Sequence, residues 1–257
     1  MTVPRRTMAR VFWRCLFLQA AWNRRGMQNL GFAYAIEPAL RALYADPARR
    51  EEALARHLRF FNCHPYMAAA ILGGAIHHEE QVAAGAEPGG AALDYKATLQ
   101  GPLAAVGDGF FWTALRPFFG AVAAVGALVA GWPAIVAALV VYNLVHAALR
   151  LGLFRAGYAR GDGVVSVIAR LSLPRLAGWL RATGALLCGV ALGILALRGG
   201  PGAALAGVPA IPLVAAAAGY LALGRGVRLL PAAYGAAAAG VGMAALAARF
   251  TGGGIHP

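Results

Sequence analysis

Apolar and polar residues alternate with a helical period from Met8 to Tyr44, as at Phe12, Leu16 and Gln19. No part of this stretch reaches the roughly 18 consecutive apolar residues that a helix needs to cross a bilayer. The pattern predicts amphipathic helices on a membrane surface, with arginines at the lipid headgroups and aromatic side chains in the acyl boundary. Amphipathic helices packed on protein would give the same pattern, so both interpretations stay open.

A charged amphipathic helix is predicted from Arg49 to Phe61, with its start at Asp46-Pro47. The segment Asn62-Cys63-His64-Pro65 ends this helix, because a residue that precedes proline is driven out of the helical region. The apolar run from Met67 to Ile76 follows, and it is too short to cross a membrane.

Glycine and proline interrupt the apolar segment from Gly101 to Phe119, at Gly101, Pro102, Gly107, Gly109 and Pro117. Such a segment is a poor continuous helix. Within a membrane, broken backbone survives only where protein or a polar cavity satisfies its hydrogen bonds, as in the substrate sites of transporters. A re-entrant hairpin is therefore predicted here.

Five apolar runs are candidate membrane spans: Phe118 to Gly131, Pro133 to Leu149, Arg181 to Leu197, Ala206 to Leu223, and Leu229 to Ala248. A tight turn at Gly131-Trp132-Pro133 joins the first two. The link from Arg150 to Arg181 carries six arginines and one acid, Asp162, so the positive-inside rule places it in the cytoplasm. Counting back through two spans places the N-terminus in the cytoplasm as well.

These patterns predict an all-α, polytopic membrane protein in three parts. Residues 1–61 hold N-terminal amphipathic helices that are cytoplasmic or interfacial, and residues 62–117 hold broken helices with re-entrant hairpins. Residues 118–257 hold about five transmembrane helices.

Composition excludes an ordinary soluble globule, since 60% of the 257 residues are apolar, 13% are charged and the mean hydropathy is +0.63. The net charge of +13 does not predict nucleic-acid binding, because the arginines are spread between apolar runs. Cys15, Cys63 and Cys188 stand far apart and predict neither a disulfide framework nor a zinc site. Apolar helices rather than alternating strands indicate an inner membrane.

Asn62 and His64 lie on the interrupted backbone between a charged helix and an apolar one. An amide and a neutral imidazole each donate and accept hydrogen bonds, which suits sugar hydroxyls. A helix cap for Asn62 and an ordinary buried histidine for His64 are the alternatives. Asp108 is an isolated acid in an apolar segment, where a charge usually faces a cavity or a partner, and Arg116 is its candidate counter-ion.

The run His77-His78-Glu79-Glu80 is either a helix end at the aqueous interface or a source of hydrogen-bond acceptors for a sugar. The sequence has no H-E-x-x-H pattern, phosphate loop, nucleophile elbow or dinucleotide fingerprint. Asn143, His146 and Arg150 form a polar stripe on one helix face. No complete enzyme site, metal site or cofactor site is predicted.

Four strings resemble the IID membrane component of mannose/fructose/sorbose-type sugar phosphotransferase systems. Residues 23–35 (NRRGMQNLGFAYA) are similar to its N-x-x-x-M-Q-x-x-G-F-x-Y-A, and residues 60–65 (FFNCHP) to its F-F-N-T-H-P. Residues 79–81 (EEQ) match the E-E-Q that ends its next helix, and residues 101–117 resemble its G-P-L-A-G-I-G-D-S-x-F-W-x-T-x-R-P. The resemblance is specific to about Gly163, with Gly109 where the family usually has serine.

The resemblance implies a subunit without a complete activity of its own. Paired with a IIC membrane subunit, it would move a hexose inward, while a cytoplasmic IIB or IIAB phosphocarrier supplies the phosphoryl group. The residues implied to line or support the sugar site are Gln28, Asn62, His64, Glu79 and Asp108. Basic surfaces around Arg49 to Arg59 and Arg150 to Arg175 are candidate docking sites for IIB, with membrane lipid headgroups as the alternative.

Two other functions fit parts of the sequence. A regulatory or scaffold subunit derived from the same family, without transport, is permitted by Gly109 and by the Ala/Gly-rich C-terminal third. An intramembrane metal hydrolase would use His64, His77 and Glu80.

Overall fold

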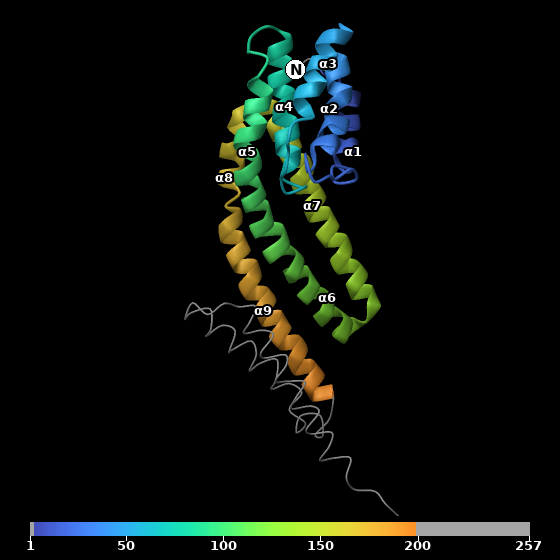
Figure 1. The fold of residues 1–257 in the computed structure, drawn as a ribbon. Helices are drawn as coiled ribbons and strands as arrows, with labels where there is room; N and C mark the ends of the chain where they lie inside the picture. Colours follow the sequence, from blue (N-terminus) through green and yellow to red (C-terminus); the bar gives the residue numbers. More distant parts are fainter. Residues whose placement is uncertain (1–2, 199–257) are drawn as a thin grey trace, which may run out of the picture. The chain divides into compact units, whose positions relative to one another are not determined.

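The computed structural model describes residues 3–198, and the predicted helical class is confirmed over this range. Its elements, drawn in Figure 1, are α1 (Arg5–Cys15), α2 (Asn29–Leu43), α3 (Pro47–His57), α4 (Ala68–Ala83), α5 (Ala91–Gly107), the π-helix η1 (Asp108–Leu115), α6 (Arg116–Ala130), α7 (Trp132–Arg160), the short 3₁₀ helix η2 (Gly161–Gly163), α8 (Val164–Arg170) and α9 (Leu173–Arg198). The backbone contacts form a compact unit over Met1–Leu187 and a second unit over Cys188–Pro257. Of the second unit only the end of α9 is described, so the candidate spans at 206–223 and 229–248 lie outside the described residues.

The helix α3 starts where the sequence predicted it. Asp46 caps its N-terminus by accepting a hydrogen bond from the Ala48 N–H at 3.1 Å, and Pro47 occupies the first turn, where no backbone donor is needed. The predicted end at Phe61 is wrong, because α3 stops at His57. Residues 58–67 then form the loop that holds the motif FFNCHP.

The helix α4 forms the centre of the first unit and is apolar on every side through its first nine residues, Ala68 to Ile76, all of which are buried. It packs against α5, α2 and α7. Two glycines permit the approach to α7: a side chain at Gly73 would overlap the Phe154 carbonyl, and one at Gly157 would overlap the Ala70 carbonyl. The first unit has one hydrophobic cluster, to which the segments 1–61, 62–117 and 118–187 all contribute.

The N-terminal helices pack on protein through one face. In α1, Val11 and Cys15 are buried, and α1 lies against α2. Trp13, on the opposite face of α1, is exposed, and so are Phe17 and Trp22 in the segment that follows. The interpretation as protein-packed helices therefore holds for the buried face, and the exposed aromatic face remains available to a membrane surface.

The predicted re-entrant hairpin at Gly101–Phe119 is wrong, because α5, η1 and α6 run on without a reversal from Ala91 to Ala130 (Figure 1). The backbone absorbs the disturbance as eight residues of π-helix, Asp108–Leu115, rather than as a break. Pro117 falls in the first turn of α6, where its missing N–H leaves no helical bond unmade. Gly and Pro therefore mark an irregular helix here and not a turn.

Two stretches, Ala91–Ala130 and Trp132–Ala191, are long and apolar enough to cross a membrane by length and composition. They meet at the predicted tight turn, where Gly131 has a φ of 74°. The expected link from Arg150 to Arg181 is largely helical, since α7 continues to Arg160 and α9 starts at Leu173. In Figure 1, α6 and α7 extend as a hairpin away from α1–α4.

Candidate functional site

The loop that carries FFNCHP is fastened to the segment before α2 by backbone and side-chain hydrogen bonds. The Gln28 N–H donates to the Phe61 carbonyl at 2.9 Å, and the Gln28 Oε1 accepts from the Cys63 N–H at 3.0 Å. Gln28 is 3% exposed, so both bonds are shielded from water. Its role in the described residues is to fix the loop from which Asn62 and His64 project.

Asn62, in the loop, and Asp108, at the start of η1, are both exposed. The backbone N–H of Asn62 donates to Gln100 Oε1 at 3.0 Å, which ties the loop to α5. Within residues 3–198, neither the Asn62 amide nor the Asp108 carboxylate has a hydrogen-bond partner. The expected ion pair of Asp108 with Arg116 is not formed. Both polar groups can therefore accept a ligand without first losing a protein contact.

His64 is buried against the π-helix. Its ring stacks on Phe111 with centroids 4.8 Å apart, and a side chain at Gly107 would overlap it. Burial, with a smaller effect of the Arg150 charge, lowers the pKa of His64 to about 4, so the ring is neutral near pH 7. The Nδ1 atom accepts from the Tyr66 N–H at 3.3 Å, which leaves the proton on Nε2, and in the described part of the chain this Nε2 has no partner.

A cavity of about 570 Å³ opens beside this loop, between η1, α6 and α7. Its walls combine aromatic rings with a few polar groups, and the side chains that matter chemically are Tyr66, Trp112, Arg116, Phe119, Tyr142 and Asn143. The His64 ring lies 5.1 Å from both the Tyr66 ring and the Trp112 ring. The volume and lining are those of a site for a small polar molecule with one apolar face.

The predicted polar stripe of α7 begins at the wall of this cavity with Asn143. His146 Nε2 and Asn143 Oδ1 are 3.0 Å apart, and the His146 ring stacks on Tyr66 at 4.6 Å. Arg150 is buried one turn further on, where its guanidinium donates to the Cys15 carbonyl and lies 5.7 Å from the Tyr66 ring. The stripe thus anchors Tyr66 from behind, while Asn143 faces the cavity.

Tyr66, Phe119 and Tyr142 were not predicted as site residues. Tyr66 directly follows the FFNCHP motif, and Tyr142 precedes Asn143, the first residue of the polar stripe. Their position beside these motifs was the feature of the sequence that could have identified them as site residues. The Phe119 ring lies 5.8 Å from that of Tyr142 and completes the wall. Trp112 and Arg116 belonged to a recognised motif, and the Arg116 guanidinium lies 5.5 Å from the Trp112 ring instead of pairing with Asp108.

Glu79 lies at the other end of α4, apart from the remaining predicted residues. Its carboxylate is fully buried and accepts hydrogen bonds from Arg56 at 2.8 and 3.0 Å, from His57 Nε2 at 2.8 Å and from the Tyr44 hydroxyl at 2.6 Å. Burial alone would raise the pKa of Glu79, but the bonds from His57, Arg56 and Tyr44 outweigh it and lower the pKa to about 2. Glu79 therefore joins α2, α3 and α4.

The histidines near Glu79 do not complete a metal centre. His77 Nδ1 lies 3.1 Å from the Tyr158 carbonyl, and His78 Nδ1 lies 2.8 Å from Glu87 Oε2. Glu80 accepts from the Val3 N–H at 3.0 Å and from the Tyr158 hydroxyl. Over residues 3–198 no group of three or more metal-ligating side chains is formed, so the alternative of a metal hydrolase has no site there.

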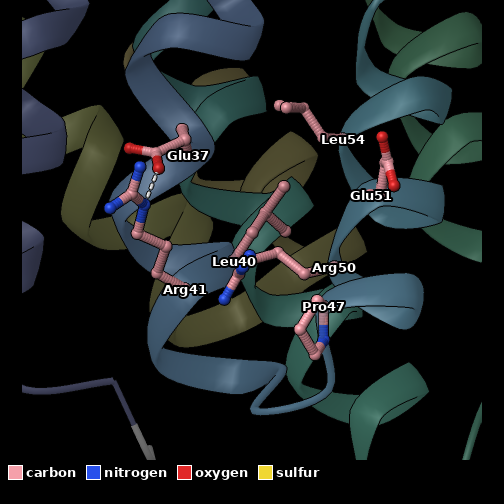
Figure 2. Close-up of a pocket in the computed structure, with 7 residues that line it drawn as sticks. All are labelled: Glu37, Leu40, Arg41, Pro47, Arg50, Glu51 and Leu54. Atoms are coloured by element: carbon pink, nitrogen blue, oxygen red, sulfur yellow. Dashed lines mark hydrogen bonds and ion pairs between the residues drawn. The ribbon is translucent and has the colours of Figure 1, made fainter.

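A second cavity, of about 310 Å³, lies between α2 and α3 (Figure 2). Leu40 and Leu54 line it together with charged side chains of both signs. Glu37 pairs with Arg41, as Figure 2 shows, and also with Arg14 at 2.8 Å. Because one of its two acids, Glu37, is already paired with arginines and no aromatic residue lines it, this cavity suits a sugar less well than the one beside His64.

Comparison with known proteins assigns the chain to a family. The model of the family described as "PTS system mannose/fructose/sorbose family IID component" matches residues 2–193. The chain is 42% identical over 160 residues to the mannose-specific EIID component of Escherichia coli K12, which is 60% of this chain and 56% of that protein. It is 35% identical over 171 residues to the fructose permease IID component of Bacillus subtilis 168, which is 65% of this chain and 61% of that protein.

Two solved structures share the fold. One, described as the mannose transporter ManYZ in complex with microcin E492, contains a chain that is 36% identical, with a TM-score of 0.60 over 74% of this chain and 70% of that chain. Another, described as a membrane protein, is 34% identical, with a TM-score of 0.67 over 75% and 71%. The relatives from Escherichia coli and Bacillus subtilis are matched over less than two thirds of their own length. Because the family model matches most of the sequence, this chain belongs to the IID component family of mannose/fructose/sorbose phosphotransferase systems.

Proposed function

We propose that the chain acts as the IID membrane subunit of a mannose-type, phosphoenolpyruvate-dependent phosphotransferase system. In this role it forms, with a IIC subunit, the path that moves a hexose inward, and a IIB or IIAB phosphocarrier supplies the phosphoryl group. The observation that carries the proposal is the cavity beside His64, which combines aromatic walls with hydrogen-bonding groups. The comparisons do not support the alternative of a regulatory or scaffold subunit that has lost transport.

The chemistry of the cavity suits a hexose. A pyranose ring has a face of C–H groups that packs on aromatic rings, here Trp112 and Tyr66, and a rim of hydroxyls that needs donors and acceptors. Asn143 donates one amide N–H to the Leu139 carbonyl and pairs its Oδ1 with His146, which leaves a second N–H and a second lone pair for a hydroxyl, and Arg116 supplies further donors. No nucleophile or general base is required in the cavity, because the phosphoryl transfer takes place on the partner protein.

The five residues implied by the resemblance divide into two roles. Asn62 and Asp108 keep free polar groups next to the loop and are proposed to meet hydroxyls on the path to the cavity. His64 is proposed to offer its Nε2–H to a hydroxyl when the sugar displaces the neighbouring rings. Gln28 and Glu79 support the site by holding the loop and the helices that carry it.

We propose the membrane topology and the partners that were expected from the sequence. The chain spans the bacterial inner membrane more than once, with its N-terminus in the cytoplasm, and the arginines between Arg150 and Arg175 lie on the cytoplasmic side. The three parts 1–61, 62–117 and 118–257 serve as cytoplasmic or interfacial helices, sugar-site region and membrane helices. The basic surface around Arg49 to Arg59, in which Arg49 and Arg59 are exposed, is the proposed docking surface for the phosphorylated IIB protein, whose phosphohistidine carries negative charge.

The test is uptake of radiolabelled mannose by cells that lack their own mannose-type system and carry this chain with its IIC and IIB partners. Omission of this chain is expected to abolish uptake, and Asn62→Ala and Asp108→Asn are expected to lower it. The matched control is Gln19→Ala, an exposed amide in a loop far along the chain from FFNCHP. Full uptake without this chain would reject the proposal, and full uptake with normally expressed variants would remove Asn62 and Asp108 from the path.

A further inference from the structure

A third cavity lies on the other side of the π-helix from the cavity beside His64, which is called the sugar cavity below. It is a groove of about 630 Å³ between η1, α7, α8 and the start of α9. Every described residue that lines it is apolar, and the contacts that define its floor and walls come from Phe110, Leu115, Leu149, Leu153, Leu171 and Leu176. Such a groove offers no hydrogen bond to a sugar or to any other polar ligand.

Exposed basic residues stand beside lining residues of this groove in the sequence. Arg170 precedes Leu171, Arg175 precedes Leu176, and Arg155 follows Leu153 by two positions, and all three arginines are exposed. Asp162 is the one acidic residue between positions 150 and 257. The segments that form the groove therefore combine an apolar lining with exposed positive charge, which is the combination that an anionic lipid favours.

From this combination we infer that the groove binds one acyl chain of an anionic phospholipid, with its phosphate at Arg155, Arg170 and Arg175. The volume of about 630 Å³ lies in the range of single small-molecule sites, roughly 300–1,000 Å³. The inference depends on the segments Ala91–Ala130 and Trp132–Ala191 lying in a membrane and not on the identity of the sugar.

A lipid in this position would contact the side of η1 opposite to the sugar cavity. Phe110 and Leu115 line the lipid groove, whereas Trp112 lines the sugar cavity and Phe111 stacks on His64. The same eight residues of π-helix therefore form a wall of both sites. The acyl chain fills a space beside η1 that would otherwise be empty. It therefore supports the part of η1 that carries Trp112 in the wall of the sugar cavity.

Glycine positions in the groove and beside it allow a direct test. Gly152 lines the groove and has no atom within 4 Å of the place that a Cβ would take, so the Cβ of Gly152→Leu is tolerated and the rest of the side chain takes space in the groove. Gly178, on the exposed side of α9, is equally unobstructed and does not line the groove, so Gly178→Leu is the matched control. Ala148→Phe fills the groove from a second position on α7.

The experiment is native mass spectrometry of the complex with its IIC partner, purified in detergent and incubated with dioleoylphosphatidylglycerol or dioleoylphosphatidylcholine. The unchanged protein and Gly178→Leu are expected to retain phosphatidylglycerol. Gly152→Leu and Ala148→Phe are expected to retain it about tenfold less or worse, because each displaces two or more methylene groups of the chain. The double variant Arg170→Gln with Arg175→Gln is expected to lose the preference for phosphatidylglycerol over phosphatidylcholine.

Two outcomes would overturn the inference. Equal retention by Gly152→Leu, Ala148→Phe and Gly178→Leu would show that the lipid does not lie in the groove. A photoreactive residue at Leu149 that crosslinks a polypeptide instead of the lipid would assign the groove to a protein partner. Because lipid retention is measured without sugar, either result leaves the test of the transport function independent.

Discussion

The imidazole of His64 lies face to face with the ring of Phe111, with centroids 4.8 Å apart and planes inclined by 13°. His64 belongs to the FFNCHP loop and Phe111 to the π-helix, so this stack joins the two most specific motifs of the chain. Trp112, the next residue, forms a wall of the sugar cavity. The position of that wall therefore depends on the stack.

Replacement of His64 separates its packing role from its hydrogen-bonding role. His64→Phe keeps a flat ring against Phe111 and removes Nε2, so the protein is expected to fold while sugar uptake falls about threefold to tenfold for one lost hydrogen bond. His64→Ala removes both and is expected to lower the folded yield as well. The readouts are uptake of labelled mannose and the fraction of monodisperse protein after heating in detergent. Full uptake by His64→Phe would show that Nε2 does not contact the sugar.

The buried carboxylate of Glu79 is expected to be important for stability and not for sugar selectivity. Glu79→Ala leaves the charge of Arg56 partly buried without its partner, which costs about 3–5 kcal/mol. The matched control is Glu52→Ala, because Glu52 also pairs with Arg56, at 3.7 Å, but its side chain is 76% exposed. The free energy of unfolding in mixed micelles measures both. Equal values for the two variants would contradict the supporting role of Glu79.

The same network makes stability fall in acid. Burial lowers the pKa of His57 from 6.5 to about 4, so the unfolded chain binds a proton that the folded protein does not, and stability declines as the pH falls from 6.5 to 4. The pKa of Glu79 is lowered to about 2, so its contribution is complete above 4.5 and is lost as the pH falls through about 2. Thermal unfolding between pH 7 and pH 4 tests the first window, and His57→Gln should flatten it.

The buried Oε1 of Gln28 is expected to stabilise the FFNCHP loop by accepting a hydrogen bond from the Cys63 N–H. Gln28→Leu leaves the buried Cys63 N–H without a partner, which costs about 1–3 kcal/mol. Gln19→Leu, at an exposed position, is expected to change stability little. Unfolding by heat in detergent distinguishes the two variants, and equal stability would mean that the loop does not need this bond.

The contact between α4 and α7 gives a prediction about packing. A side chain at Gly157 would overlap the Ala70 carbonyl, whereas one at Gly101 would meet open space. Gly157→Val is therefore expected to push the helices apart and destabilise the protein by about 1–3 kcal/mol or more, and Gly101→Val to have a small effect. The yield of folded, monodisperse protein measures the difference.

The sequence predicted those features that depend on neighbouring residues. The start of α3 at Asp46-Pro47, the turn at Gly131 and the shared face of Asn143 and His146 each follow from residues within one or two turns. The sequence motifs also identified the family before the fold was known, because a motif is recognised from consecutive residues and does not depend on tertiary contacts.

The features that were missed depend on residues far apart in the chain. Glycine and proline between Gly101 and Pro117 indicate irregular backbone, but only packing against His64 and the helices around it decides between a break and a π-helix. The cavity takes Tyr66, Trp112 and Tyr142 from three separate segments. The partners of Glu79 likewise lie 22 to 35 residues away in sequence, so its role as a support could not be read from the cluster around it.

The measurement that tests the account most directly is phosphoenolpyruvate-dependent phosphorylation of labelled mannose by membrane vesicles that contain this chain, its IIC partner and the soluble phosphocarriers. Trp112→Ala is compared with Trp132→Ala, because Trp132 is 73% exposed at the turn between α6 and α7 and does not line the cavity. The account predicts that Trp112→Ala strongly lowers sugar phosphorylation while Trp132→Ala leaves it unchanged. Equal phosphorylation by the two variants, at equal amounts of folded complex, would contradict the assignment of the cavity as the sugar site.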